Sequence, residues 1–365
     1  MTIETRKRSR VVDLSRPGGR VGIELDAAEA AEVLMSVCCL CADDYDAYEL
    51  GEQRLQQSRA AIDPQLLAAV TEIGGSNGKL VARLLGLVYE TPPPRTFPAF
   101  LERLQATEPL ELQLLLLGYQ MRGYHLAVPP ETILAAAQGD AEARARLLEV
   151  TAEWPDDRHA TENLLQLGGS ELKRRLLALL PHWYEQVFRP LAAEALAATE
   201  RDAAAKRELV RTHSAEEIVE LVTNGVQYTP GPEVKKVVFF PTYWLRPWVM
   251  LVDHKDVTIF CYPVGEPAEA GEASAPAQLA RIFKALGDEG RLRILKRLSE
   301  GPLALGEAAD LLGVAKSTAH HHLAILRQAG FVFVRDGAEK VYTLRSDLLP
   351  QTGALLDAYL RPPGR

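Results

Sequence analysis

The segment from residue 277 to residue 346 constrains the fold of this chain most, because short helical patterns give way there to a β-hairpin pattern. Gly313 lies between two helical patterns, Leu305–Leu312 and Lys316–Gln328, where a left-handed residue would make the tight turn of a helix-turn-helix. Two strand patterns then follow, at Phe331–Arg335 and Lys340–Leu344, on either side of a polar tip at 336–339. The sequence therefore predicts a helix-turn-helix followed by a β-hairpin wing.

The second helix of this pair, Lys316–Gln328, carries hydrogen-bond donors in its first turns. In a helix-turn-helix this helix enters the major groove of duplex DNA, where such side chains contact phosphates and base edges. Leu323 and Leu326 are expected to face the core. We expect the contacts to the groove to come from Lys316, Ser317, Thr318, His320 and His321. We expect the contacts to the DNA backbone to come from Arg327, Arg335 and Lys340.

The charge of the chain is unevenly distributed. The whole sequence has a formal net charge of −8, which is unusual for a protein that binds DNA. Residues 276–346, however, contain 11 Lys and Arg against 7 Asp and Glu, so the segment carries +4 and the remainder −12. A basic segment on an acidic body fits a small DNA-reading module joined to a larger domain with another role.

Three stretches of this segment, Leu286–Leu295, Ser317–Leu326 and Ala329–Val332, resemble the ArsR/SmtB family of winged-helix repressors, and Val341-Tyr342 at the end of the wing completes the pattern. The resemblance implies DNA contacts from the donors already named, Lys316 to His321. It also implies a homodimer that reads an inverted repeat in double-stranded DNA. The helices before and after the module would form the dimer surface, and residues 347–360 would be the last of them.

No metal site is predicted in the module. Neighbouring helical residues point about 100° apart, so the consecutive histidines 320–322 cannot converge on one ion. Members of the resembled family bind metals through a Cys-x-Cys at the third helix or through Asp, His and Glu on the last helix. Here residues 303–307 contain no cysteine, and the last helix has Asp347 and Asp357 but no histidine. Both family sites are therefore absent.

Cys38, Cys39 and Cys41 leave two interpretations open. They could hold a soft metal or sense oxidation, since Cys38 and Cys41 lie on one helical face. The alternative, which we favour, is that they are small apolar residues packed inside a helix. Their close spacing suits no disulfide framework, and a reducing compartment is expected.

The chain upstream of the module is mainly helical in pattern. We expect a disordered basic tail over 1–19, one domain over 20–262 and a linker over 263–276. Strand patterns at 20–25, 234–240, 248–252 and 257–262 interrupt the helices, and Asp253–Asp256 is a turn between the last two. Because strands need partners, a small sheet should join the two ends of this domain. The predicted fold is mainly α with small β sheets: a helical amino-terminal domain plus a carboxy-terminal winged helix-turn-helix.

An aromatic cluster in the amino-terminal domain has two interpretations. It could line a pocket for a small-molecule effector, or it could form the core between sheet and helices. Its members are Phe240, Tyr243, Trp244, Arg246 and Trp248. Thr223–Val226, Leu245–Trp248 and Ile259–Pro263 make this domain resemble the helical amino-terminal domain of some long ArsR-like regulators. That resemblance implies no chemistry.

The sequence contains no catalytic motif, cofactor-binding motif, membrane-length apolar run or secretory signal that we recognise. We therefore expect a cytoplasmic transcriptional regulator without enzymatic activity, a cofactor or a membrane partner. It should act as a repressor and be controlled through its amino-terminal domain. The alternative is an enzyme or a protein-interaction domain that the winged helix tethers to DNA.

Overall fold

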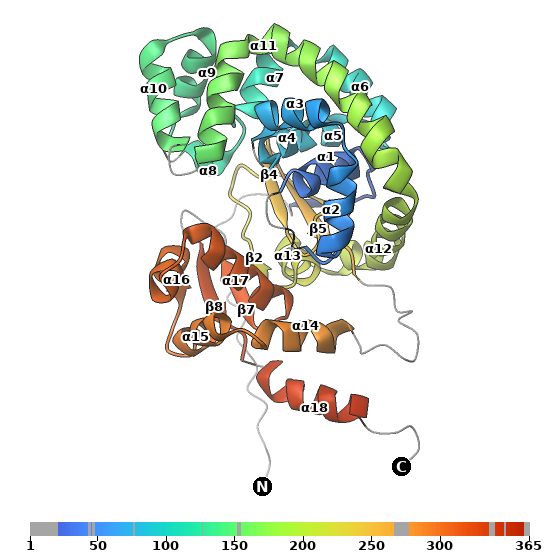
Figure 1. The fold of residues 1–365 in the computed structure, drawn as a ribbon, viewed down its shortest axis with the longest axis vertical. Helices are drawn as coiled ribbons and strands as arrows, with labels where there is room; N and C mark the ends of the chain where they lie inside the picture. Colours follow the sequence, from blue (N-terminus) through green and yellow to red (C-terminus); the bar gives the residue numbers. More distant parts are fainter. Residues whose placement is uncertain are drawn as a thin grey trace.

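The computed structural model describes residues 21–42, 45, 48–75, 77–125, 127–151, 155–265, 277–335, 340–346 and 348–360. Within these ranges the chain is mainly helical with two four-stranded sheets, which confirms the predicted fold class. Figure 1 shows a large helical body and, beneath it, a smaller module at the carboxy-terminal end. The predicted tail 1–19, residues 266–276 of the predicted linker and the wing tip 336–339 lie outside the described residues.

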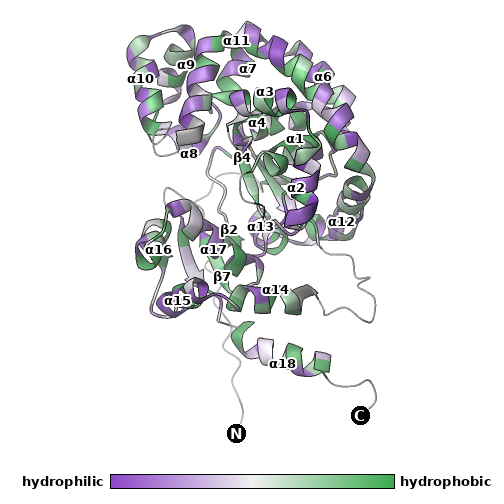
Figure 2. Ribbon diagram, in the orientation of Figure 1, coloured by the Kyte–Doolittle hydropathy of each residue, from purple (hydrophilic) through white to green (hydrophobic). Residues whose placement is uncertain are grey.

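The helices of the body surround a buried central helix, α1 (Glu29–Leu40), and the outer ones turn hydrophilic residues outward (Figure 2). Residues of α1 from Ala30 to Leu40 are all buried, as expected for a helix whose side chains are mostly apolar. The other body helices are α2 (Glu52–Ala60), α3 (Pro64–Gly74), α4 (Lys79–Ala82), α5 (Leu85–Glu90), α6 (Phe97–Ala106), α7 (Pro109–Leu116), α8 (Arg122–His125), α9 (Pro130–Gln138), α10 (Ala141–Val150), α11 (Pro155–Trp183), α12 (Ala192–Thr212) and α13 (Ala215–Thr223). No described helix has both the length and the apolar character needed to cross a membrane.

The helical chain is interrupted at Pro190, between α11 and α12. Proline cannot donate a backbone hydrogen bond and its ring clashes with the preceding turn, so it disrupts a regular helix. The chain passes instead through a π-helical turn, Tyr184–Phe188, and a 3₁₀ turn, Arg189–Leu191. Gly168, with φ of 69°, makes a second break inside α11 that the sequence pattern did not predict.

The first sheet lies in the body and has the strand order β1-β3-β5-β4. Its strands are β1 (Gly22–Leu25), β3 (Lys236–Thr242), β4 (Met250–His254) and β5 (Val257–Pro263). β4 and β5 form the predicted antiparallel hairpin, with His254 opposite Val257. β1 pairs in parallel with β3, so the predicted sheet between the two ends of the body is confirmed.

The second sheet belongs to the module, except for one strand from the body. The module contains α14 (Ala277–Leu286), α15 (Glu289–Leu298), β6 (Leu303–Ala304), α16 (Leu305–Leu312), α17 (Lys316–Gln328), β7 (Val332–Arg335), β8 (Val341–Leu344) and α18 (Leu348–Leu360). β7 and β8 form the predicted wing hairpin. The body strand β2 (Val226–Gln227) adds to this sheet in parallel with β7.

Body and module also share a hydrophobic core. Val219 and Phe239 of the body belong to the same buried cluster as Ile282, Leu323 and Phe331 of the module. Burial of apolar surface is the main favourable contribution to such packing. The module is therefore packed onto the body through a strand pairing and a common core.

Candidate nucleic-acid interface

Helix α17 has the position and turn expected of a recognition helix. Gly313 ends α16 in the left-handed conformation, with φ of 69° and ψ of 36°, as the sequence predicted. A side chain would be strained at that φ, so glycine suits the turn. Ala319, Leu323 and Leu326 then turn one face of α17 into the core, where all three are buried.

The first turn of α17 is exposed. Lys316, Ser317 and Thr318 are all exposed, and the N-cap residue, Ala315, provides no side-chain cap. Backbone N–H groups at the start of a helix are not bonded within the helix, and they carry a partial positive charge that attracts phosphate. This turn therefore combines a lysine, two hydroxyls and a helix N-terminus on an accessible surface.

His320 and His321, predicted to contact DNA, lie instead against the body. The Trp248 ring stacks on the His320 ring with a centroid distance of 5.6 Å and an interplanar angle of 20°. It also contacts His321 at 6.0 Å, while Tyr48 packs on Trp248 at 6.4 Å. Both histidines are half-buried. In this conformation neither ring is presented to a DNA groove.

The environment of His320 favours its neutral form. Burial is the largest cause, and the positive charges of Lys340, Lys79 and Arg327 add to it, so the pKa of His320 falls to about 3. An imidazole in water has a pKa of about 6.5. The docked histidine is therefore uncharged at neutral pH and would have to leave this environment to become a cation.

Arg327, which was predicted to contact the DNA backbone, is buried in this conformation. Arg327 is 5% exposed and its guanidinium donates a hydrogen bond to the carbonyl of Thr223. Burial lowers the pKa of Arg327 to about 10. The physical reason is that the last turn of α17 packs against the junction of α13 and β2, where the Asn224 amide also donates to the Gln328 carbonyl at 2.7 Å.

A loop of the body covers much of the outward face of α17. We call residues 243–249, which join β3 to β4, the clasp loop. Its Trp248 covers the two histidines, and its Pro247 carbonyl accepts a hydrogen bond from the Gln328 amide. Helical geometry places Ala324 and Gln328 opposite the core-facing leucines. Ala324 is nevertheless only 7% exposed. Only the first turn of α17 is fully accessible.

The wing residues predicted to grip DNA are at the surface. Arg335 and Lys340 are both exposed, at the facing ends of the β7–β8 hairpin. Arg335 also borders a surface cavity of about 380 Å³ and pairs in register with Gln227 of β2. The other residues around that cavity are Glu216, Glu220, Tyr228 and Thr229.

The aromatic cluster proposed as an effector pocket is mostly core. Phe240, Tyr243 and Trp244 are buried, with exposures of 0%, 4% and 2%, which supports the core interpretation of these residues. The Arg246 guanidinium lies 4.3 Å from the centroid of the Tyr243 ring. Trp248 contacts the recognition helix instead of lining a pocket. No sequence pattern indicates this contact, because about seventy residues separate Trp248 from His320 and His321.

The four cysteines are buried, and none is in a disulfide. Burial raises the pKa of Cys38 to about 12 and that of Cys39 well above its usual range. A buried thiol that stays protonated is a poor nucleophile and a poor metal ligand. In the described part of the chain, no group of three or more His, Cys, Asp or Glu side chains could hold a metal ion.

Comparison with known proteins identifies the module. Residues 288–333 match the family model described as "Bacterial regulatory protein, arsR family". The chain is 42% identical over 71 residues to YceK, an uncharacterised HTH-type transcriptional regulator of Bacillus subtilis, and the match covers 19% of this chain and 71% of YceK. It is 35% identical over 69 residues to the transcriptional repressor SdpR of the same species, covering 19% and 77%. With the transcriptional activator HlyU of Vibrio cholerae it shares 39% identity over 71 residues, covering 19% and 66%.

Each of these matches covers about a fifth of this chain, so they characterise a module and leave the role of the body open. The matched residues 288–333 contain α16, Gly313 and α17, which are the helix-turn-helix described above. A helix-turn-helix of this type binds DNA, as in transcriptional regulators. The chain belongs to the arsR family of bacterial regulatory proteins.

Proposed function

We propose that this chain is a transcriptional regulator, not an enzyme, and that its body controls access of α17 to DNA. The observation that carries the proposal is the unequal exposure of α17. Its first turn is accessible, whereas Trp248 and Pro247 cover the face that continues from it. The major groove, about 12 Å wide, accommodates one helix and not a helix with a loop lying on it. Full DNA contact therefore requires the clasp loop to withdraw.

The proposed control is a shift between two conformations. In the closed one, the clasp loop lies on α17 and only the first turn and the wing can reach DNA. In the open one, His320, His321 and Gln328 are released to the groove. The connection of the module to the body through β2, β7 and Arg327 can persist in both. If only the open conformation binds DNA fully, the apparent affinity is the affinity of the open conformation multiplied by the fraction of molecules that are open.

We propose further that the chain acts as a homodimer on an inverted repeat. Apolar side chains are exposed on α14 and α18, the first and last helices of the module: Phe283, Leu349, Tyr359 and Leu360, the last with 66% exposure. Figure 1 shows α18 beneath α14 and away from the body, and Figure 2 shows hydrophobic residues along it. Such surfaces on a regulator commonly mark a protein interface. Two copies joined there would present two α17 helices to successive turns of the groove.

Repression is the sign that we propose, as for the similar regulator SdpR. HlyU, which is similar over a comparable length, is an activator. A reporter gene driven by the promoter upstream of this chain's own gene tests the sign. Deleting the regulator should raise expression of the reporter, and a fall in expression would contradict repression.

The main test is a titration of full-length protein against that upstream DNA, followed by fluorescence anisotropy at one fixed salt concentration. Lys316→Ala should weaken binding about tenfold, since one charged contact is lost. Lys235→Ala is the matched control, because Lys235 is an exposed body lysine paired with Asp256. Trp248→Ala should strengthen binding up to about tenfold, the value of one aromatic contact. Trp248→Phe should lie between wild type and the alanine variant.

Two outcomes would contradict the proposal. Equal binding by the wild type and Lys316→Ala would remove α17 from the DNA interface. Weaker binding by Trp248→Ala would mean that Trp248 supports DNA contact instead of covering it. Sedimentation of a Leu360→Asp variant tests the dimer separately. That variant should be monomeric at concentrations where the wild type is dimeric.

A further inference from the structure

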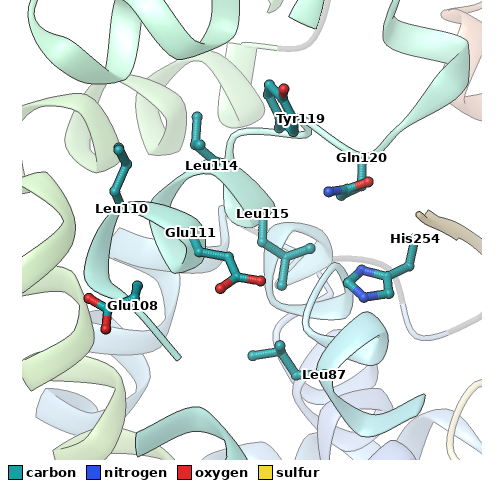
Figure 3. A pocket seen from close by; sticks show the side chains of 9 residues that line it. All are labelled: Leu87, Glu108, Leu110, Glu111, Leu114, Leu115, Tyr119, Gln120 and His254. Carbon is teal, nitrogen blue, oxygen red and sulfur yellow. The ribbon is translucent and has the colours of Figure 1, made fainter. Parts of the chain in front are cut away.

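A cavity of about 320 Å³ opens in the body beside the end of strand β4 (Figure 3). It lies between α5 and α7, and the turn after α7 and His254 complete its wall. Leu87 and Leu115 are buried in its floor, and Leu110 is exposed at its edge. The residues around it are Leu87, Glu108, Leu110, Glu111, Leu114, Leu115, Tyr119, Gln120 and His254. This volume is at the lower end of the range for small-molecule sites, which is about 300–1,000 Å³.

The charged side chains of this cavity are both acidic. Glu108 and Glu111 line it, and its lining includes no lysine or arginine. Among the described residues neither carboxylate has an ion-pair partner, whereas Glu90 nearby pairs with Arg103, His254 and Lys255. Figure 3 shows Glu111 extending from α7 between the leucines, on the side nearer to His254. Both carboxylates are exposed, at the rim of an apolar floor, and this arrangement suits a ligand that is apolar over most of its length and positive at one end.

His254 adds an unsatisfied polar atom to the wall of the cavity. It is 2% exposed, and its Nε2 lies 2.8 Å from Oε1 of Glu90. Burial raises the pKa of Glu90, but hydrogen bonds from Lys255, His254 and Arg103 outweigh it and lower this pKa to about 2. Glu90 is therefore a carboxylate, and Nε2 of His254 donates the hydrogen bond to it. In a neutral imidazole Nδ1 is then an acceptor, and in the described structure it has no partner. Buried polar atoms usually have a partner, so this one favours a donor near the wall.

We propose that this cavity binds an amphipathic organic amine, whose ammonium group lies at Glu111, on the side nearer to His254, and whose hydrocarbon part packs on the leucines. The proposal rests on the proposed function in one respect: the amine would be the effector that sets the position of the clasp loop. The acceptor groups of the cavity fit this class of ligand, because a carboxylate and an imidazole acceptor both take hydrogen bonds from an N–H group. A carboxylate ligand would be repelled by the same residues.

The position of His254 connects this cavity to the clasp loop. β4 begins at Met250, directly after the clasp loop, and ends at His254. Its pairing with β5 over the whole length from Met250 to His254 makes it a rigid element. Gly86 of α5 lies against the His254 ring so closely that a Cβ there would come within 2.3 Å of Nδ1. A ligand that shifts α5 or the His254 ring therefore acts on the strand that directly follows the clasp loop and its Trp248.

Calorimetric titration of the full-length protein without DNA tests the site, with 4-phenylbutylamine as the probe and 4-phenylbutanol as its neutral counterpart. The amine should bind about tenfold more tightly than the alcohol, the value of one charged hydrogen bond. Glu111→Gln should remove this preference and leave the affinity for the alcohol unchanged. Glu131→Gln, an exposed substitution on α9 outside the cavity, is the matched control. Leu114→Trp, which fills the cavity, should abolish binding of both compounds.

Equal affinity for amine and alcohol, no binding at millimolar concentration, or an unchanged preference in Glu111→Gln would each overturn the site. The connection to the clasp loop has its own test. A saturating amount of the amine should change the DNA affinity of the wild type and leave that of Trp248→Ala unchanged. An equal change in both proteins would overturn the connection. Because calorimetry uses no DNA, failure of the amine site and failure of DNA binding are observed separately.

Discussion

The two ends of helix α17 lie in different surroundings. At its beginning, Lys316, Ser317 and Thr318 are exposed and hydrophilic, as in an isolated DNA-binding module. At its end, Arg327 is buried and bonded to the body, and the Gln328 amide donates to the clasp loop. A cationic side chain on a recognition helix can therefore serve the fold instead of DNA. Which role it has depends on the surface that its turn of the helix meets.

Helix α17 makes two kinds of contact with the body, one through hydrogen bonds and the other through an aromatic ring. Arg327 and Asn224 join α17 to the α13–β2 junction through hydrogen bonds to backbone carbonyls, next to a strand pairing. Trp248 contacts α17 mainly by ring stacking from a loop. A buried charge is costly to expose without its partner, whereas an aromatic contact is worth only about 0.5–1.5 kcal/mol beyond its buried area. The clasp loop is therefore the contact that a ligand can most readily release.

The largest expected effect tests the contrast between the two ends directly. Arg327→Ala should lower the free energy of unfolding by about 3 kcal/mol, because it removes a buried side chain and leaves the Thr223 carbonyl unpaired. Lys316→Ala, at the other end of the same helix, should change it by less than about 0.5 kcal/mol, as is usual for an exposed residue. Urea unfolding followed by circular dichroism measures both. Similar losses in the two variants would remove the contrast.

The second prediction concerns the anchor of the clasp loop on the body. Glu32 of α1 is 0% exposed and its Oε1 accepts a hydrogen bond from the Tyr243 backbone, at the start of the loop. Burial raises the pKa of Glu32 to about 7, from an ordinary value of 4.5. The folded state then binds the proton more tightly than the unfolded state. Its contribution to stability is present below pH 4.5 and is lost as the pH rises to about 7.

Glu32→Gln keeps an acceptor for the Tyr243 N–H but cannot ionise. The difference in unfolding free energy between variant and wild type should therefore grow in favour of the variant between pH 4.5 and 7.5, by up to about 3 kcal/mol. His254 and Glu90 also make the free energy of unfolding depend on pH, but they do so in both proteins, so the comparison at each pH cancels their contributions. Urea titrations at pH 5 and pH 7.5 provide the measurement, and a difference that does not depend on pH would contradict the raised pKa.

The sequence was most informative where a local rule decides the structure. The left-handed turn at Gly313, the inward leucines of α17 and the β4–β5 hairpin each follow from glycine geometry, helical spacing or strand alternation. Strand β2 escaped prediction because Val226-Gln227 is too short to show alternation. The burial of Arg327 could not be predicted, for a different reason. Its partner Thr223 lies 104 residues earlier, and exposure is the usual state of an arginine.

The candidate site was predictable only in part, because the sequence specifies which residues can donate but not which surface covers them. Trp248 was recognised as part of an aromatic cluster with Phe240 and Trp244. These two lie in the core, whereas Trp248 stands at the edge against His320. No periodicity distinguishes the two positions, since residues 243–249 form a loop. Long-range packing decided this part of the site.

The smallest effect that we predict is a pH response of DNA binding through the clasp loop. His320 has a pKa of about 3 when docked, with Lys79, Arg327, Lys340 and His321 around it. Once undocked it should return to about 6.5. The lowered pKa means that docking is at full strength above pH 6.5 and weakens as the pH falls, by about tenfold at pH 5.5. Acidification should therefore favour the open conformation.

The measurement is anisotropy with the upstream DNA at pH 7.5 and pH 5.5 and constant salt. Wild-type affinity should rise on acidification by more than that of Trp248→Ala, and the ratio of the two responses should not exceed about tenfold. The comparison is needed because protonated His320 and His322 would also attract phosphate, and that attraction acts in both proteins. Trp248→Ala lacks the stacked contact, so only the docking contribution differs. Equal pH responses in the two proteins would mean that the clasp loop and the exposed first turn of α17 act independently.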